Sequence, residues 1–356
     1  MRSRLHAITA LVVSVCLLPA SAAHATGTHR RVSVWLPYWS MSAANTSTTD
    51  NASVISTASP FWYDVSGDST LVSHSGAGST SLISGWHSRH LRVVPTVTES
   101  QKAHDFGLMG TLTSRRAAHV ATLAKIVRSR AYDGLDLDYE NLAVFRSGYS
   151  TTDAKRASQA LTLVVRDTCA MLHKLGKTCG VTVMARTDDS QTLFRNVLAT
   201  WEYDYRALGR AADRVRVMAY GEHGPTSAPG PIGSITWVKK VITYTRQTIS
   251  PSRVELALPA FGDDWSASGN VEVTSRQAAA TAKAYGATIR YDAAAHETTY
   301  TYTRSGVHHT VWYGDPRGLD ERTGLALAAS FAGIAIWAAG EEQAGVWPRL
   351  RARLTY

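Results

Sequence analysis

The sequence predicts an α/β fold, a (β/α)8 TIM barrel with a small α+β insertion after the seventh strand. Eight short runs rich in β-branched and aromatic residues follow one another, and most connections between them repeat apolar residues at helical spacing. The connection after the seventh run departs from this rhythm. A length of 356 residues would allow two domains, but there are no internal repeats, so we expect one barrel with an insertion. The expected strands are 32–36, 60–65, 91–97, 133–140, 179–185, 214–220, 254–258 and 333–337.

Residues 1–25 have the three regions of a secretory signal peptide. Arg2 and Arg4 precede an apolar run over 8–18, and small residues follow that run. The run is shorter than the roughly 20 residues that a membrane-spanning helix needs. We therefore expect 26–356 to be the mature protein, secreted and either extracellular or associated with the cell wall, without stable membrane insertion.

Helical patterns lie between most of the strands, whereas 43–57 is expected to be a Ser/Thr/Asn-rich connection. The expected helices are 113–130, 153–175, 192–212, 235–247 and 322–331. The insertion, about 269–316, is expected to contain a helix over 275–285 and a β-hairpin formed by 300–303 and 308–313. We expect it to form a wall beside the top of the barrel.

The charge and the histidines exclude several classes of site. The formal net charge is +9, but Lys and Arg are scattered and no nucleic-acid-binding motif accompanies them, so we expect no nucleic-acid partner. Attraction to an anionic cell envelope, or simple solubility, explains the net positive charge better than nucleic-acid binding does. The 13 histidines form no HExxH or other zinc spacing, and no metal or cofactor is expected. We expect a monomer.

Cys169 and Cys179 are the two cysteines that remain once the expected signal peptide is removed. An even number in an oxidising compartment favours one disulfide, with two buried thiols as the alternative. A bridge would pin the helix over 153–175 to the strand that follows it.

The expected strand over 133–140 carries three acids on one face. Successive side chains of a strand point to opposite faces, so acidic and apolar residues separate here. The acids are Asp136, Asp138 and Glu140. The apolar residues between them are Leu135, Leu137 and Tyr139. This apolar face, with helical patterns on both sides of the strand, disfavours a solvated edge strand or a calcium loop.

The carboxyl ends of barrel strands carry the chemistry in this fold class, which places Glu140 where a substrate would bind and Asp136 deepest. Burial and mutual repulsion should raise the pKa of at least one of these carboxyls. We expect Glu140 to be protonated at neutral pH and to act as a general acid.

The acidic strand resembles the DxxDxDxE signature of glycoside hydrolase family 18, the chitinase-type barrels. Residues 218–220 are similar to the M-x-Y element of that family, and Trp337 resembles its sugar-stacking tryptophan. The segments 229–238 and 311–313 are similar to the branch that contains bacterial spore-cortex and cell-wall N-acetylglucosaminidases. The likeness covers roughly residues 31–347.

The resemblance implies a retaining, substrate-assisted glycosidase acting on a β-linked N-acetylglucosamine-containing polysaccharide, either chitin or peptidoglycan. Glu140 would protonate the glycosidic oxygen, and the 2-acetamido group of the substrate would attack the anomeric carbon. Asp138 would orient that group, Asp136 would share a proton with Asp138, and Tyr220 would hydrogen-bond the acetamido oxygen. The residues expected to contact sugar are Met218, Trp337, Trp265 and Tyr38. Packing of the insertion is the alternative role for Trp265.

Gly221 departs from the family pattern, which usually has Asp after the M-x-Y element. It leaves open whether the neighbouring Glu222 replaces that Asp. It also leaves a second interpretation, a non-catalytic chitinase-like lectin, although such lectins typically lose the acid at the position of Glu140. The choice among chitin, peptidoglycan and N-glycan core, and between endo and exo action, stays open.

Overall fold

The computed structural model describes residues 31–65, 69–99, 113–140, 151–189 and 203–354. The signal peptide expected over 1–25 lies outside these residues. So does the first part of the helix expected over 192–212, whose described part is the short helix α6 (Tyr205–Ala211).

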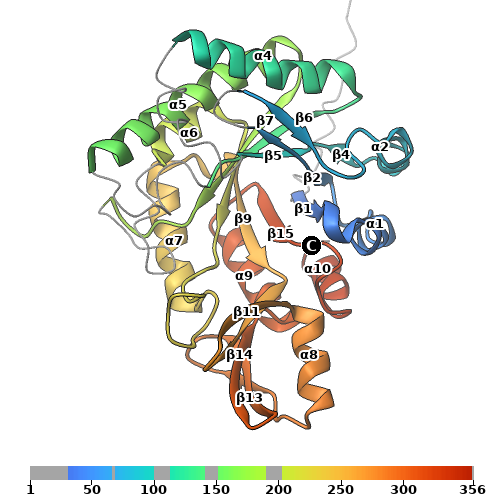
Figure 1. The fold of residues 1–356 in the computed structure, drawn as a ribbon, viewed down its shortest axis with the longest axis vertical. Coiled ribbons are helices and arrows are strands. Elements are labelled where there is room, and N and C mark those ends of the chain that lie inside the picture. The colour runs from blue at the N-terminus through green and yellow to red at the C-terminus, as the bar shows by residue number, and fades with distance from the viewer. Residues whose placement is uncertain (1–30, 66–68, 100–112, 141–150, 190–202, 355–356) are drawn as a thin grey trace, which may run out of the picture.

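Eight parallel strand positions close into a barrel, which confirms the predicted fold class (Figure 1). Strand β1 hydrogen-bonds to both β15 and β2, so the order β1-β15-β9-β8-β7-β6-β5-β2 returns to its start. The barrel strands are β1 (Arg31–Pro37), β2 (Thr57–Val65), β4 (Arg92–Val93) with β5 (Thr96–Glu99), β6 (Gly134–Asp138), β7 (Thr178–Met184), β8 (Arg214–Met218), β9 (Val254–Pro259) and β15 (Gly333–Trp337).

Pro95 interrupts the third barrel strand, which the sequence predicted as one strand over 91–97. Proline has no N–H to donate to a neighbouring strand, so the ladder breaks there. Two short strands fill this position, β4 pairing with β2 and β5 pairing with both β2 and β6. A further strand that the sequence did not predict, β3 (Leu71–Ser73), runs antiparallel to β2.

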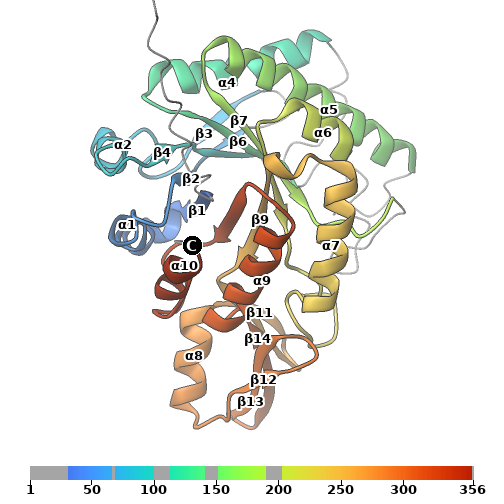
Figure 2. The same ribbon diagram turned by 180° about the vertical axis from the view of Figure 1, so that it is seen from behind.

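Helices pack around the barrel, and in both views α9 lies between α7 and α10 (Figure 2). They are α1 (Met41–Asp50), α2 (Thr80–His87), α4 (Thr113–Ser129), α5 (Thr151–Lys174), α6, α7 (Ile235–Thr248), α9 (Pro316–Ala328) and α10 (Val346–Leu354), with 3-10 turns η1 (Tyr38–Ser40) and η2 (Pro251–Arg253).

Two helices differ from the prediction. Helix α1 lies in the segment predicted as a polar connection, and it buries Ala44 and Thr48, one turn apart, while packing against β1. Helix α9 begins at Pro316 rather than near residue 322, because the Asp315 carboxylate accepts a hydrogen bond from Gly318 N at 2.7 Å and proline suits the first helical turn.

The insertion forms a second, antiparallel sheet of five strands in the order β11-β10-β14-β13-β12. It lies at the lower end of the molecule in Figure 1, where α8 covers it. Its elements are β10 (Phe261–Ser266), β11 (Gly269–Thr274), α8 (Ser275–Ala284), β12 (Arg290–Asp292), β13 (Glu297–Arg304) and β14 (Val307–Tyr313). The sheet starts at Phe261, earlier than the expected start near residue 269, because β10 pairs with both β11 and β14.

A buried ion pair fastens the insertion to the barrel through the loop 221–233, which follows β8. The Glu297 carboxylate accepts hydrogen bonds from Ile232 N at 2.7 Å and Gly233 N at 3.1 Å. Arg322 of α9 pairs with Glu297 at 3.0 Å and donates from Nε to the carbonyl of Gly233 at 3.1 Å. We call this arrangement the Glu297–Arg322 clamp. Both charged side chains are buried, so their mutual pairing offsets the cost of removing them from water.

None of the helices in the described ranges has the length and apolar character needed to cross a membrane.

Candidate active site

Asp136 lies at the centre of the barrel, where four neighbouring side chains donate hydrogen bonds to its carboxylate. Its Oδ2 accepts from Trp35 Nε1 at 3.1 Å, Thr96 Oγ1 at 3.2 Å, Thr182 Oγ1 at 3.2 Å and Arg216 Nη1 at 2.8 Å. These donors come from β1, β5, β7 and β8, so the carboxylate joins four strands besides its own.

Glycine at position 180 makes room for this carboxylate. Gly180 pairs with Asp136 across β6 and β7, and a Cβ at position 180 would lie 2.9 Å from Asp136 Oδ1. A side chain there would displace the carboxylate from its donors.

Arg216 is the partner that the sequence analysis missed. Its guanidinium pairs with Asp136 on one side and, through Nε, with Glu255 at 3.1 Å on the other. It also lies 5.1 Å from the centre of the Trp35 ring. A charged residue between Val215 and Val217 in a strand predicted to be buried was the available signal, because such a residue needs a buried counter-charge.

Asp138 and Glu140 form a hydrogen-bonded carboxyl pair above Asp136. Asp138 is 4% exposed and its pKa is raised well above the usual value by burial and by the charges of Glu140, Asp136 and Glu99. Glu140, just beyond the end of β6, is partly exposed. The row therefore runs from a fully buried Asp136 to a Glu140 that reaches solvent, in the expected order.

A fourth carboxylate, Glu99, supports Glu140 from the end of β5. Its Oε2 accepts a hydrogen bond from Glu140 N at 2.9 Å. Tyr139, which points away from the acids, holds the same stretch of backbone: its carbonyl accepts from Tyr203 OH at 2.9 Å, and its hydroxyl lies 2.9 Å from His119 Nε2. The backbone that carries Asp138 and Glu140 is therefore held from both sides of the strand. Glu99, which lies two residues beyond Val97 in the run 96–99, was not among the residues predicted from the sequence.

Tyr220 and Met218 lie at the carboxyl end of β8, separated from β6 by one strand. Both side chains are buried, and the Tyr220 ring packs edge-on against Phe261 with centres 5.4 Å apart. Gly221, directly after Tyr220, has φ of +86°, a region that side-chain-bearing residues rarely adopt. The Glu222 carboxylate accepts a hydrogen bond from Ser234 N at 2.6 Å, so Glu222 holds the loop 221–233.

Aromatic rings surround the end of β15. Trp337 lies 4.8 Å from Phe61, 6.0 Å from Trp35 and 6.3 Å from Trp39, measured between ring centres. Trp337 is partly exposed, whereas Trp39 is 60% exposed. One face of the Tyr38 ring is covered by His74, whose ring stacks on it at 4.0 Å. Of the adjacent residues Tyr38 and Trp39, Trp39 therefore has the larger exposed ring surface available for contact with a sugar.

Trp265 packs the insertion against the loop 221–233. Its side chain is 6% exposed, and its Nε1 donates a hydrogen bond to the carbonyl of Gly224 at 3.2 Å. These contacts describe a packing role for Trp265, which was the alternative to sugar contact expected from the sequence.

Cys169 of α5 and Cys179 of β7 are joined by a disulfide with Cα atoms 5.2 Å apart. Within the described ranges, no cluster of three or more His, Cys, Asp or Glu side chains could hold a metal ion.

The family described as "Glycosyl hydrolases family 18" matches residues 38–342. An uncharacterized glycosylase YvbX of Bacillus subtilis (strain 168) is 29% identical over 246 residues, which cover 68% of this chain and 66% of that protein. A cortical fragment-lytic enzyme of Bacillus anthracis is 32% identical over 148 residues, which cover 39% of this chain and 34% of that protein. The chain thus spans just under two thirds of the first relative and about a third of the second.

Two solved structures share the fold. A chitinase from Chromobacterium violaceum ATCC 12472 superposes with a TM-score of 0.78 at 22% identity, covering 92% of this chain and 99% of that one. The spore cortex-lytic enzyme SleL of Bacillus cereus superposes with a TM-score of 0.77 at 19% identity, covering 90% of this chain and 73% of that one.

Proposed function

Because the chain belongs to glycosyl hydrolase family 18, we propose that it is a secreted glycosidase that cleaves β-linked N-acetylglucosamine-containing polysaccharide, either chitin or peptidoglycan. The observation that supports this most directly is the hydrogen-bonded pair of Asp138 and Glu140 at the carboxyl end of β6. A carboxyl held protonated beside a partly exposed Glu is suited to donate a proton to a leaving group.

The proposed mechanism is retaining and substrate-assisted. A proton held between Asp138 and Glu140 passes through Glu140 to the glycosidic oxygen, which leaves with the bonding electron pair. The carbonyl oxygen of the 2-acetamido group attacks the anomeric carbon and forms an oxazolinium ion. Asp138, left as a carboxylate, stabilises the positive charge of this ion. Glu140 then takes a proton from the water that opens the ring.

Other residues orient the substrate in this proposal. Tyr220 donates to the acetamido oxygen, Met218 lines the subsite, and Trp337 lies beneath the sugar ring. The aromatic cluster around Trp337 favours this, because the apolar face of a pyranose packs against aromatic rings. Asp136 is a positioning residue: its four donors hold it in place, and its charge contributes to the raised pKa of Asp138.

Export and assembly belong to the same proposal. The signal-peptide pattern of residues 1–25 supports a secreted, extracellular or wall-associated protein. We propose that the protein acts as a monomer on its glycan.

The test is turnover of an N-acetylglucosamine oligomer by a Glu140→Gln variant. Loss of a general acid should lower kcat by on the order of 10² to 10⁴ while the oligomer still binds. Glu321→Gln, on the outer helix α9, is the matched control and should keep wild-type turnover. Near wild-type turnover by Glu140→Gln would contradict the assignment.

Two further measurements separate the mechanism from the lectin alternative. Mass analysis of chitin oligomers and peptidoglycan fragments incubated with the wild-type protein should reveal cleaved products and identify the polymer. Binding without any product would favour the lectin. Substrates with a 2-hydroxyl in place of the 2-acetamido group should bind but resist cleavage, and equal cleavage of both kinds would exclude the substrate-assisted route.

A further inference from the structure

A pocket of about 420 Å³ lies between α6 and the turn that joins α7 to β9. Its lining includes three arginines, Arg206 and Arg210 of α6 and Arg253 of η2. In the described part of the chain, no Asp or Glu is among the lining residues. Figure 2 shows α6 beside one end of α7. The pocket between them is therefore cationic.

This cationic pocket lies at the end of the barrel opposite the acidic row. Helix α6 precedes β8 and Arg253 directly precedes β9, so both walls stand where the chain enters the barrel strands. Glu140, in contrast, lies just beyond the carboxyl end of β6. Because the barrel strands are parallel, their amino ends lie together at one end and their carboxyl ends at the other.

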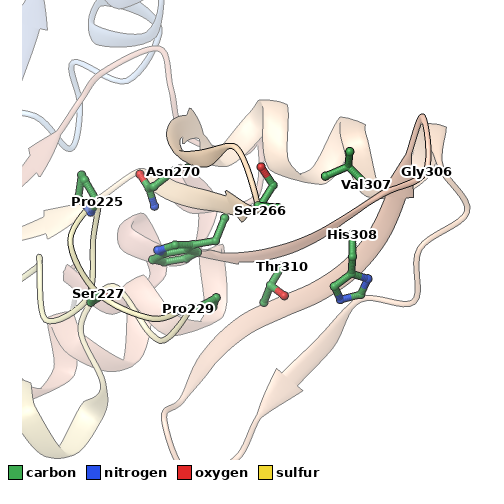
Figure 3. A pocket seen from close by; sticks show the side chains of 12 residues that line it. Pro225, Ser227, Pro229, Ser266, Asn270, Gly306, Val307, His308 and Thr310 are labelled. Atoms are coloured by element: carbon green, nitrogen blue, oxygen red, sulfur yellow. The ribbon is translucent and has the colours of Figure 1, made fainter.

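Another pocket, drawn in Figure 3, differs from the cationic pocket in both charge and position. It lies between the loop 221–233 and the insertion, and its lining includes Pro225, Pro229 and Thr310. Among the described residues that line it, none is Asp, Glu, Lys or Arg. Its walls follow the carboxyl ends of β8 and β9, on the side of the proposed active site. The clustering of arginines is thus particular to the pocket beside α6.

Local geometry brings the three arginines to one cavity. Arg206 and Arg210 stand four residues apart on α6, so their side chains leave the same face of the helix, although like charges at this spacing destabilise a helix slightly. Gly209 lets α6 approach the end of α7 closely, because a Cβ at position 209 would lie 2.9 Å from Ile249 Cγ2. This close approach places the α6 arginines beside Arg253.

Two of the guanidinium groups are held in place by backbone carbonyls. Arg253 Nη1 donates to three carbonyls at the end of α6, over distances of 2.8 to 3.3 Å. Arg206 Nη1 donates to the carbonyl of Gln247 at 3.0 Å. The side chain of Arg210 makes no hydrogen bond or ion pair with any residue that the structure describes. The pocket therefore combines two positioned cations with one that has no counter-charge.

The two acids near these arginines are engaged outside the pocket. Asp189 Oδ2 lies 3.6 Å from Arg206 Nη2, but the Asp189 side chain is 74% exposed and its Oδ1 accepts from Tyr244 OH. Asp213 interacts electrostatically with Arg253, while its Oδ2 accepts from Cys179 N at 2.9 Å. Neither carboxylate lines the pocket. Guanidinium groups around one cavity repel one another, and an anion between them relieves that repulsion.

The chemistry of the lining suits a phosphate group better than a carboxylate. The planar fork of arginine pairs with either group, but a carboxylate has two oxygens in one plane, whereas a phosphate has more acceptor oxygens and a larger charge to share among several arginines. Ser250 Oγ, 3.1 Å from Ser252 Oγ, adds a hydroxyl to the lining. A volume of about 420 Å³ also leaves room for a group esterified to the phosphate.

We propose that this pocket binds phosphate, either as the free ion or as the phosphate of an ester. The inference goes beyond the proposed glycosidase activity and does not depend on it. Since the acidic row lies at the other end of the barrel, a phosphate-bearing molecule held beside α6 leaves the carboxyl ends of the strands free for substrate.

Substitutions of Arg210 test the pocket. Arg210→Gln removes the arginine that has no counter-charge, and Arg210→Lys keeps the charge but loses the planar fork. The matched control is Arg246→Gln, which makes the same charge change at an exposed position in the last turn of α7, outside the pocket lining. Arg210 is itself exposed, so each variant should fold, as thermal unfolding and circular dichroism would establish.

Binding is measured by calorimetry at constant ionic strength with four soluble probes. These are inorganic phosphate, glycerol 3-phosphate, the diester glycerophosphoglycerol, and acetate as the carboxylate. The wild-type protein should bind a phosphate probe at one saturable site and more tightly than acetate. Arg210→Gln should weaken this binding roughly tenfold to hundredfold, the value of a hydrogen bond to a charged group. Arg210→Lys should lie between Arg210→Gln and the wild type, and Arg246→Gln should change affinity less than about twofold.

The comparison of probes also identifies the source of the phosphate. Tightest binding of inorganic phosphate would indicate the free ion, and tightest binding of either ester would indicate a phosphate-bearing molecule. Equal weakening by Arg210→Gln and Arg246→Gln would reflect general surface charge and would overturn the proposal. So would acetate binding as tight as phosphate binding, or the absence of saturable binding by every phosphate probe. Binding to phosphatidylglycerol vesicles without binding to the soluble probes would place the interaction at a membrane surface and contradict the pocket.

Discussion

Arg216 Nη1 donates to Asp136 Oδ2 at 2.8 Å across the interior of the barrel, and neither side chain is more than 4% exposed. The two residues stand on β8 and β6, with β7 between them. Arg216 also pairs with Glu255 of β9, which has Arg214 Nε within 3.8 Å as well, so the Arg216 guanidinium joins two buried carboxylates. The most deeply buried acid of the row is thus held by a buried cation.

Replacing Arg216 should therefore destabilise the fold strongly. Arg216→Met leaves Asp136 buried without its cation and Glu255 with only the more distant Arg214, and the free energy of unfolding should fall by about 3 to 5 kcal/mol. Urea unfolding followed by circular dichroism measures this. Arg166→Met, at an exposed position of α5 where Arg166 pairs with Asp167, is the control and should cost less than about 1 kcal/mol. Similar losses in both variants would argue against the central role of Arg216.

Asp138→Asn should lower activity and also change how stability depends on pH. The raised pKa of the Asp138 carboxyl means that its stabilising contribution is complete below the unfolded-state pKa near 4 and is lost as pH rises through the folded-state pKa. Asparagine has no such titration. The stability of the variant relative to the wild type should therefore increase as pH rises from 4 to 8. Denaturant unfolding at pH 4, 6 and 8 gives the trend, and a difference that stays constant with pH would count against it.

His119 should make the fold sensitive to mild acid. Burial lowers its pKa from 6.5 to about 4, so the unfolded chain binds a proton between these values that the folded protein does not. Stability should be complete above pH 6.5 and should fall by on the order of 3 kcal/mol as pH drops to 4.

The matched variant for this acid sensitivity is His119→Gln, which keeps a hydrogen-bonding group near Tyr139 OH but does not titrate. In this variant the free energy of unfolding should fall less steeply than in the wild type as pH drops from 6.5 to 4. An unchanged slope in His119→Gln would place the acid sensitivity elsewhere.

Trp39→Ala should weaken substrate binding with little effect on chemistry. Trp39 is 60% exposed beside Trp337, and it is not among the groups that move protons. Loss of its stacking surface should raise KM for N-acetylglucosamine oligomers roughly threefold to tenfold at nearly constant kcat, as expected when binding is lost equally from ground and transition states. Trp39→Phe should restore most of the affinity. A fall in kcat with unchanged KM would assign Trp39 a different role.

Local patterns in the sequence were sufficient to predict the barrel and the position of its acidic row. The alternation in 133–140 predicted which residues of β6 face the interior, and the family predicted from that strand is confirmed. Helix α1 was missed because its residues carry no apolar stripe and it forms by packing of Ala44 and Thr48 against the barrel. Arg216 and Glu99 were missed for a different reason: their roles depend on partners far away in the sequence, which side-chain periodicity does not identify.

The Glu297–Arg322 clamp makes the insertion and the barrel inseparable as engineering modules. Without the insertion, the buried Arg322 guanidinium of α9 would lose its Glu297 counter-charge. The backbone N–H groups of Ile232 and Gly233 would lose the carboxylate that accepts their hydrogen bonds. A chimera that exchanges substrate specificity between relatives must therefore transplant the insertion, the loop 221–233 and the first half of α9 as one unit.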